Sequence, residues 1–386
     1  MKLVLVIPSL ERGGAERILT MLAGGWAKRG DHVTLVVFSR GEAAEYPLDP
    51  HVRLLSLNIP NTRAGHIVQA VWRHLRRMLA LRRIVRGIQP DVVISFIDLS
   101  NILTLLATIG LKVAVVVSER ANPEHVPLGT IWEWLRRLTY PHATALVCQT
   151  NAMVQLVQKQ IKVPGWAIPN PVELPESRAA TPASKGPGLM LVGMGRLVPQ
   201  KGFDLLLGAF SRVADRHPEW SLTIIGVGPL RKQLEEQAQM LGVGGRVQFA
   251  GLLLDPFPVI RTAQLFVFSS RFEGFGNALT EAMACGLPAI SFDCPAGPGE
   301  IIRDGVDGIL VPPEDVNALA AALDQLMTDN ALRESFARRA PEVLNRFSVE
   351  KVLSQWDALF TRVALERMKV ESPADAKRKQ GSVPPG

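Results

Sequence analysis

One segment in the second half of the chain places the tightest limits on its fold. Leu265–Ser269 is an apolar run of strand length, and Glu273-Gly-Phe-Gly-Asn-Ala-Leu-Thr-Glu281 follows it as a glycine-containing loop that enters a short helix. We expect Asn277 to be the N-cap of that helix, Gly286 to take the left-handed position after its last turn, and Pro288 to prevent its continuation. The segment is therefore predicted to be a strand–loop–helix unit of an α/β sheet.

This loop combines two features that predict a particular kind of ligand. Backbone N–H groups at the start of a helix attract an anion, because that end of the helix is electropositive. Glu273 in the loop and Glu281, expected on the first turn of the helix, add two carboxylates to the same unit. A ligand that carries both phosphates and sugar hydroxyls would use both features, so we predict a nucleotide-sugar site. The alternative is an ordinary amphipathic helix with capping charges.

Strand-like and helical patterns alternate through the rest of the chain. Apolar runs of strand length occur at residues 3–7, 32–38, 52–57, 91–96, 113–118, 145–148, 189–194, 222–225, 247–250, 289–292 and 309–311. Helical patterns such as Ala15–Lys28 lie between most of them, and this alternation predicts parallel sheets with right-handed crossovers. Because 386 residues exceed the size of one hydrophobic core, we expect two α/β domains.

Two segments lack apolar periodicity. Residues 171–188 are rich in Pro, Ala, Ser and Gly and are predicted to be a linker. Residues 369–386 follow the last helical pattern and are predicted to be a disordered tail. The remaining chain divides into an N-terminal domain at 1–170, a C-terminal domain at 189–345 and a final helix at 346–368.

Composition narrows the class of protein. With 47% hydrophobic and 20% charged residues the chain is globular. Cys148, Cys285 and Cys294 have no C-x-x-C spacing, which favours reduced thiols in a cytosolic protein over a metal site. The apolar first strand is too short for a signal peptide, and no apolar run has the length of a transmembrane helix. We expect a soluble or surface-bound protein.

Positive charge is concentrated in one stretch. Residues 1–175 carry 20 Lys and Arg against 12 Asp and Glu, and Arg63–Arg86 contains seven arginines and no acid. This stretch has helical spacing with Trp72 at its edge, which predicts contact with an anionic bilayer or a lipid pyrophosphate, a solvated helix being the alternative. Core packing is favoured for the tryptophans of Ile131–Arg137. The arginines expected to contact an acceptor lipid are Arg73, Arg76 and Arg77.

A second loop supplies cations. Gly195-Arg196-Leu-Val-Pro-Gln-Lys201-Gly202 follows the first strand of the second half and precedes a helix. Arg196 and Lys201 are placed to hold a diphosphate from two sides, and fixed cations lower the barrier to its departure. A solvated surface pair is the alternative.

The Glu-x7-Glu string and the G-R-L-x-x-x-K-G element together resemble glycosyltransferase family 4, a family of retaining enzymes. The resemblance implies the GT-B fold, in which two Rossmann-like doubly wound parallel-sheet domains face a cleft and a C-terminal helix crosses back to the first domain. It also implies that Arg196 and Lys201 bind the donor phosphates, that Glu281 binds the ribose and that Glu273 faces the donor sugar. The backbone around the helix start would contact sugar and phosphates, at Phe275, Gly276, Asn277, Ala278 and Leu279.

Two N-terminal elements resemble the acceptor side of the same family. Gly13 and Gly14 open the first helix, where a backbone can approach an anion closely. Ser118-Glu119-Arg120-Ala-Asn-Pro123 resembles an element of the lipid-linked, amylovoran-type members, in place of the His-centred element of many relatives. The resemblance implies that Arg120 meets the acceptor pyrophosphate and that Glu119 orients an acceptor hydroxyl. A loop salt bridge is the alternative.

The resemblance implies a metal-independent retaining glycosyltransferase. It would move a hexose or N-acetylhexosamine from a UDP-sugar to a polyprenyl-pyrophosphate-linked saccharide, at the inner face of the plasma membrane. Without a Walker A sequence, a complete dinucleotide fingerprint, Asp-x-Asp or an aromatic stacking face, we expect no cofactor, metal ion or nucleic-acid partner. The alternatives are a nucleotide-sugar epimerase or hydrolase, a transferase with a non-lipid acceptor, and a non-enzymatic lipid-binding module.

Overall fold

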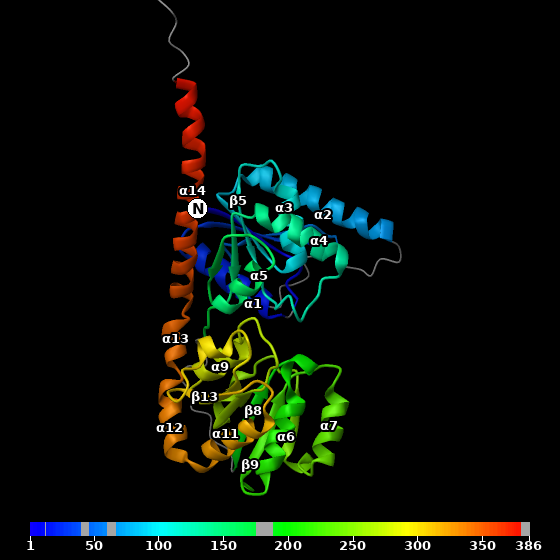
Figure 1. Cartoon of the computed structure of the whole chain (residues 1–386), viewed down its shortest axis with the longest axis vertical. Coiled ribbons are helices and arrows are strands. Elements are labelled where there is room, and N and C mark those ends of the chain that lie inside the picture. The colour runs from blue at the N-terminus through cyan, green and yellow to red at the C-terminus, as the bar shows by residue number, and fades with distance from the viewer. Residues whose placement is uncertain (12, 40–45, 60–66, 175–187, 380–386) are drawn as a thin grey trace, which may run out of the picture.

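The computed structural model describes residues 1–11, 13–39, 46–59, 67–174 and 188–379. It has two α/β domains, one above the other in Figure 1, and a long C-terminal helix that runs beside the N-terminal domain. The predicted linker falls mostly on residues 175–187, which lie outside the described residues.

The N-terminal domain is built on a seven-stranded parallel sheet in the order β3-β2-β1-β4-β5-β6-β7. Most of these strands are apolar and buried on both faces, as is usual where helices cover both sides of a parallel sheet. Only β7 was not predicted, because three residues are too few to show a pattern. The strands are β1 Lys2–Ile7, β2 His32–Val37, β3 Arg53–Ser56, β4 Val92–Phe96, β5 Ala114–Ser118, β6 Ala145–Cys148 and β7 Gly165–Ala167.

Helices on the two faces of this sheet form two separate apolar cores. One core lies under α1 and the C-terminal helix, and the other lies under the helices of the opposite face. The helices are α1 Gly14–Lys28, α2 Ile67–Ile88, α3 Asp98–Thr108, α4 Thr130–Thr139 and α5 Asn151–Gln158.

The C-terminal domain repeats the plan with six parallel strands in the order β10-β9-β8-β11-β12-β13. Its strands are β8 Leu189–Met194, β9 Trp220–Ile225, β10 Val247–Gly251, β11 Leu265–Phe268, β12 Ala289–Phe292 and β13 Gly308–Val311. Its helices are α6 Phe203–Ala214, α7 Arg231–Met240, α8 Phe257–Thr262, α9 Asn277–Ala284, α10 Pro298–Ile301, α11 Val316–Thr328, α12 Asn330–Arg339 and α13 Glu342–Arg346. Two doubly wound parallel sheets are therefore confirmed.

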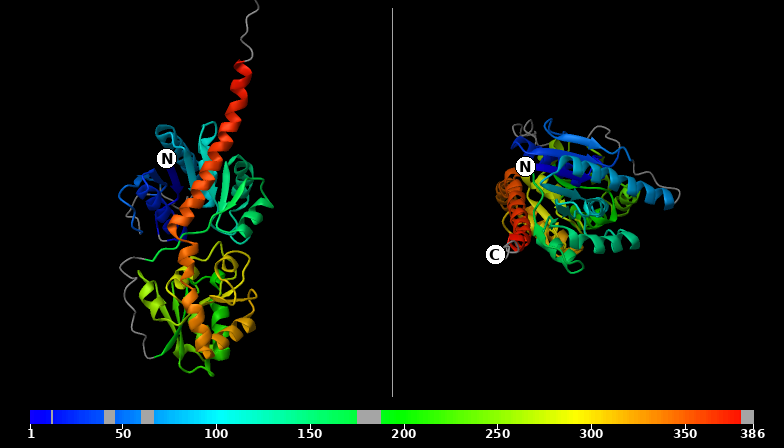
Figure 2. Two further views of the ribbon diagram at one scale, coloured as in Figure 1. Left: turned by 90° about the vertical axis from the view of Figure 1, so that its left-hand side faces the viewer. Right: turned by 90° about the horizontal axis from the view of Figure 1, so that it is seen from above.

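The last helix, α14 Val349–Lys379, leaves the C-terminal domain and packs against the first domain, as Figure 2 shows. Trp356 of α14 meets Trp26 of α1 edge to face, with ring centroids 5.9 Å apart. At the exposed edge of this contact between α1 and α14, Arg29 Nη1 lies 2.7 Å from Asp357 Oδ2. The predicted return of the C-terminal helix to the first domain is confirmed.

The predicted disordered tail at 369–386 is corrected in part. The structure continues α14 as a helix to Lys379, and residues 380–386 lie outside the described residues. Glu, Ala, Lys and Arg are good helix formers, so a polar sequence can extend a helix that already has an apolar anchor. The absence of apolar periodicity therefore does not exclude a helix.

Each sheet reverses its strand order at one point, between β1 and β4 and between β8 and β11. In open parallel sheets ligands bind outside the carboxyl ends of the strands at such points. The loops after β1, β8 and β11 carry the predicted motifs. The fold therefore brings motifs from distant parts of the sequence to one region between the domains.

Candidate active site in the interdomain cleft

The loops that follow β8 and β11 bring a lysine and a glutamate into contact. Lys201 Nζ lies 2.5 Å from Glu273 Oε1, and both side chains are largely buried. Gly202 allows this approach, since its φ of 59° is left-handed and a Cβ there would lie 2.0 Å from the Ser269 carbonyl oxygen. Arg196, from the same loop as Lys201, is exposed. One predicted phosphate-binding cation and the predicted sugar-binding carboxylate are therefore in contact, and the second cation lies on the same loop.

The entry to α9 departs from the predicted capping. Gly276, with φ of 125°, is the N-cap, and Asn277 is the first helical residue. The Asn277 side chain instead accepts a hydrogen bond from Asn170 Nδ2 of the other domain at 2.8 Å. Because the helix starts at Asn277, Glu281 lies on its second turn and not on its first. Gly286 has the predicted left-handed backbone, with φ of 87°.

Side chains of the loop before α9 are anchored in the core. Phe275 is buried and meets Phe347 edge to face, with ring centroids 5.5 Å apart. Leu279 is also buried, whereas Ala278 is half-buried. Gly297 packs on the Phe275 carbonyl, where a Cβ would lie 1.8 Å from the oxygen. The buried side chains of Phe275 and Leu279 are therefore not placed to contact a ligand, which leaves the backbone of this segment for the predicted role.

Glu281 pairs with an arginine of the other domain. Its Oε1 accepts a hydrogen bond from Arg17 Nη1 on the first turn of α1. Burial raises the pKa of Glu281 above its usual range, and the charge of Arg17 opposes that rise. Arg17 was not predicted as a site residue, because it meets Glu281 only when the domains face each other.

The glycine loop after β1 also lies at this cleft. A Cβ on Gly14 would lie 3.0 Å from Asn277 Nδ2. Gly13 is extended and precedes α1 as its N-cap. The structure thus places the two glycines beside the predicted donor residues.

Arg120 is held in an unusual environment between the domains. Its Nη1 lies 2.6 Å from Asn170 Oδ1, and its guanidinium lies 3.7 Å from the centroid of the Phe96 ring. Burial lowers the pKa of Arg120 to about 9. A Cβ on Gly274 would lie 2.8 Å from the Arg120 carbonyl oxygen, so Arg120 lies next to the donor loop. Asn170 joins Arg120 to Asn277 and was not singled out from the sequence.

The structure corrects the prediction for Glu119. Its side chain is 1% exposed and points into the first domain, where Tyr140 donates a hydrogen bond to Oε2 at 2.7 Å. Arg136 Nε lies 3.7 Å from the same oxygen, and Asp98 lies nearby. Burial and then the charge of Asp98 raise the pKa of Glu119 well above its usual range. A carboxyl group enclosed in this way cannot reach an acceptor hydroxyl.

The backbone is strained next to the residues that surround Glu119. Ile97, which follows β4 and is the N-cap of α3, has φ of 75°, an unfavourable value for a β-branched residue. It immediately precedes Asp98. The side chain of Asn101, one turn later, donates hydrogen bonds to the Ser118 carbonyl at 3.1 Å and to the Tyr140 hydroxyl at 3.0 Å. These contacts fix the end of β5, from which Arg120 extends.

The three arginines predicted to meet an acceptor lipid have different environments. Arg76 is exposed and Arg73 is half-buried. Arg77 is 2% exposed, and its Nη2 donates a hydrogen bond to the Ile59 carbonyl at 2.7 Å. Burial lowers its pKa to about 10. The assignment of Arg77 to lipid contact is therefore wrong, because its position on α2 faces the sheet.

Exposed apolar side chains follow α2 and α4. On α4 they recur at helical spacing and include Trp134 at 62% exposure, which overturns the prediction that Trp134 packs in the core. The two helices touch where His74 meets Trp132 edge to face, with ring centroids 4.9 Å apart. We call this region the α2/α4 face; its exposed apolar residues are Val68, Val71, Trp72, Leu79, Ile131, Trp134 and Leu138.

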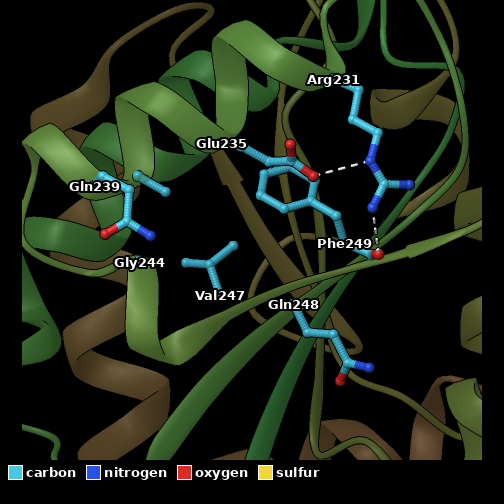
Figure 3. Close-up of a pocket in the computed structure, with 8 residues that line it drawn as sticks. Arg231, Glu235, Gln239, Gly244, Val247, Gln248 and Phe249 are labelled. Atoms are coloured by element: carbon cyan, nitrogen blue, oxygen red, sulfur yellow. Dashed lines mark hydrogen bonds and ion pairs between the residues drawn. The ribbon is translucent and has the colours of Figure 1, made fainter.

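A pocket on the C-terminal domain lies apart from these residues. Figure 3 shows it between α7 and β10, lined by side chains that include Arg231, Glu235 and Phe249. Arg231 is neutralised there, because its Nε donates a hydrogen bond to Glu235 Oε1 at 2.9 Å. None of the predicted site residues lines this pocket. The candidate active site is instead the group of residues around Lys201, Glu273 and Glu281 between the two domains.

Two facing Rossmann-like domains with cations and carboxylates gathered between them define a GT-B glycosyltransferase. Family models agree over most of the chain: the glycosyl transferase 4-like domain matches residues 13–170, and glycosyl transferases group 1 matches residues 175–343. The chain belongs to glycosyltransferase family 4, and it is a transferase.

Named relatives support this assignment. The lipopolysaccharide core biosynthesis glycosyltransferase LpsE of Rhizobium meliloti is 30% identical, over 88% of this chain and 93% of the relative. An α-1,4-N-acetyl-D-galactosaminyltransferase of Campylobacter jejuni is 28% identical, over 94% of this chain and 99% of the relative. Its name includes a diNAcBac-PP-undecaprenol saccharide. An exopolysaccharide phosphotransferase of Streptomyces coelicolor is 30% identical over 92% of this chain, which spans only 40% of that relative.

Solved structures confirm the fold. Sucrose-phosphate synthase from Thermosynechococcus elongatus superposes with a TM-score of 0.80 at 18% identity, covering 95% of this chain and 99% of the other. Anabaena HepE, solved in complex with UDP and glucose, superposes with a TM-score of 0.77 at 19% identity, covering 94% and 99%. At these identities the likeness concerns the fold.

Proposed function

We propose that this enzyme transfers a sugar from a UDP-sugar to a polyprenyl-pyrophosphate-linked saccharide with retention of configuration, without a metal ion. The observation that carries the proposal is the contact of Lys201 with Glu273 in the loop that leads into α9, the helix that carries Glu281. Cations and helix-start amides suit a diphosphate, and carboxylates suit sugar hydroxyls. Anabaena HepE binds UDP in its solved complex, which supports a uridine nucleotide.

In the proposed reaction the bond between the sugar C1 and the diphosphate oxygen breaks as the acceptor oxygen bonds to C1 from the same face. The acceptor proton passes to the departing phosphate oxygen. Arg196, Lys201 and the amides at residues 275–279 stabilise the charge that grows on the diphosphate. Glu273 holds the donor sugar and Glu281 the ribose. Closure of the two domains excludes water, which would otherwise hydrolyse the donor.

On the acceptor side we assign Arg120, Gly13 and Gly14 to the approach of the lipid pyrophosphate. Arg120 lies next to the donor loop, so an anion held there would present its saccharide to the donor sugar. The name of the Campylobacter relative includes a PP-undecaprenol saccharide, which supports a lipid-linked acceptor.

We further propose that the α2/α4 face docks on an anionic membrane, at the inner surface of the plasma membrane. The described residues include no helix with the length and apolar character needed to span a bilayer. An amphipathic surface with tryptophans and arginines can instead lie in the headgroup region. Three arginines of α2 are exposed on the same helix as the apolar residues of the α2/α4 face: Arg76, Arg83 and Arg86. The helix has no acidic residue to offset their charge.

Reversing the exposed charges of α2 is expected to abolish membrane binding. Each arginine near an anionic surface contributes about 1 kcal/mol, so Arg76→Glu, Arg83→Glu and Arg86→Glu together should weaken binding by at least about 100-fold. Sedimentation with phosphatidylglycerol vesicles measures this. The matched control reverses the exposed Lys159, Lys162 and Lys232 and should bind as the unchanged protein does. Equal loss in both variants would show that net charge, and not the α2/α4 face, drives binding.

The proposed function is tested by incubating the enzyme with a panel of UDP- and GDP-sugars and a short polyprenyl-pyrophosphate saccharide, followed by mass spectrometry. A product heavier by one or more hexose or N-acetylhexosamine units supports the proposal, and retention is read from the anomeric coupling constant of that product. Conversion of the donor without an acceptor would instead favour an epimerase or hydrolase of the same fold. Equal transfer to a lipid-free saccharide would remove the lipid from the proposal.

A further inference from the structure

The first turn of α1 reaches across the cleft to the predicted donor residues. Gly14 lies against Asn277, and Arg17 pairs with Glu281. Burial raises the pKa of Glu16 above its usual range, and the charge of Arg196 opposes that rise. Two nearby positions of α1 therefore contact residues of the C-terminal domain that were assigned to the donor.

Because Glu281 is buried, its charged form depends on the ion pair with Arg17. The Glu281 residue is 8% exposed, and a buried carboxylate is costly unless a charged or hydrogen-bonding partner compensates it. Removing one partner of a buried ion pair leaves an uncompensated charge. The compensation for Glu281 comes from the other domain, so its charged state depends on how the two domains meet.

The Arg17 contact leaves acceptor capacity on Glu281. A carboxylate has two oxygens with about four acceptor positions, and Arg17 is bonded to Oε1. Oε2 remains for a ribose hydroxyl, so guanidinium and ribose can be bound together. Displacing Arg17 by a neutral hydroxyl would instead give up the charge pair, which makes sharing the more favourable arrangement.

We propose that Arg17 is a positioning residue that orients Glu281 for the ribose of the donor, so that the nucleotide site is complete only when the two domains are together. This inference rests on the proposed UDP-sugar donor. Arg17 itself does not touch the reacting atoms. It acts through Glu281 and links donor binding to domain closure.

The test is isothermal titration of the full chain with UDP. Arg17→Ala is expected to weaken UDP binding at least 10-fold, and Arg17→Lys is expected to recover part of that loss because it keeps the charge. In steady-state assays the donor KM should rise more than kcat falls. In a double-mutant cycle, Arg17→Ala should have little effect once Glu281 is alanine, because the two residues act as a unit.

Arg29→Ala removes the same charge from the other end of α1, where Arg29 pairs with Asp357 of α14, and should leave UDP affinity unchanged. Unchanged binding of UDP by Arg17→Ala would overturn the inference, since Arg17 would then have no effect on nucleotide affinity. Tighter binding would also overturn it, since Arg17 would then compete with the nucleotide for Glu281. Failure of the unchanged enzyme to bind UDP would overturn the proposed donor as well.

Discussion

Replacement of Glu273 by glutamine is expected to lower kcat for sugar transfer by about 10²–10³-fold, the loss typical of removing one pre-organised polar group from an active site. Glutamine keeps the size of the side chain but removes the charge that holds Lys201 and the second acceptor oxygen offered to the sugar. Lys201 is then free to approach the diphosphate, so UDP affinity should not fall. Initial rates with a saturating donor and calorimetric UDP binding separate the two effects.

The matched control is Glu314→Gln. Glu314 Oε2 accepts a hydrogen bond from Arg271 at 2.9 Å in the same domain, but its side chain is half exposed and lies outside the predicted motifs. It should leave kcat within about two-fold, because exposed ion pairs contribute little. A Glu273→Gln enzyme that retained full kcat would contradict the proposed contact with the donor sugar. A parallel loss of UDP affinity would indicate a damaged site instead.

Arg136→Ala is expected to lower the free energy of unfolding by about 3–5 kcal/mol, the range found when one partner of a buried charge pair is removed. The Arg136 side chain is fully buried, and it is placed between Glu119, Tyr140 and Glu133. Without it, the buried carboxyl cluster loses its positive charge and must take up a proton or remain unpaired. Urea unfolding followed by circular dichroism measures the change.

Arg137→Ala serves as the comparison. Arg137 is the next residue on α4, but its side chain is 62% exposed and its Nε lies 3.6 Å from Glu133 Oε1. Its removal should cost under about 1 kcal/mol. If both variants were equally stable, the cluster around Glu119 would not stabilise the fold. Arg136→Lys, which keeps the charge, should lie between the two.

The strands and the loop–helix units could be predicted because their signals are local. Buried parallel strands are short continuous apolar runs, and each of the twelve predicted runs is a strand. The Glu-x7-Glu string and the G-R-L-x-x-x-K-G element each lie within one loop–helix unit, so their residue types and spacing show which chemistry they can perform. The contact between Lys201 and Glu273 then follows from adjacent loops of one sheet.

Predictions that depended on the direction of a side chain were less successful. Arg76 and Arg77 are neighbours in sequence, yet one is exposed and the other is buried against Ile59 and Phe38. Glu119 and Arg120 likewise point to opposite sides, into the domain and toward the cleft. The rotation of a helix or strand end about its axis is set by packing, which charge content alone does not reveal. Trp134 was misplaced for the same reason.

The sequence by itself determined two α/β domains and the two loop–helix motifs, because apolar periodicity, glycine positions and short motifs are properties of contiguous residues. The return of the last helix was predicted from the resemblance to the family. Tertiary structure decided which charged groups meet. Arg17 and Glu281 are 264 positions apart and belong to different domains, and Asn170 joins Arg120 to Asn277 across the same cleft. Such contacts depend on how two separately folded sheets face each other, and this arrangement leaves no local pattern in the chain.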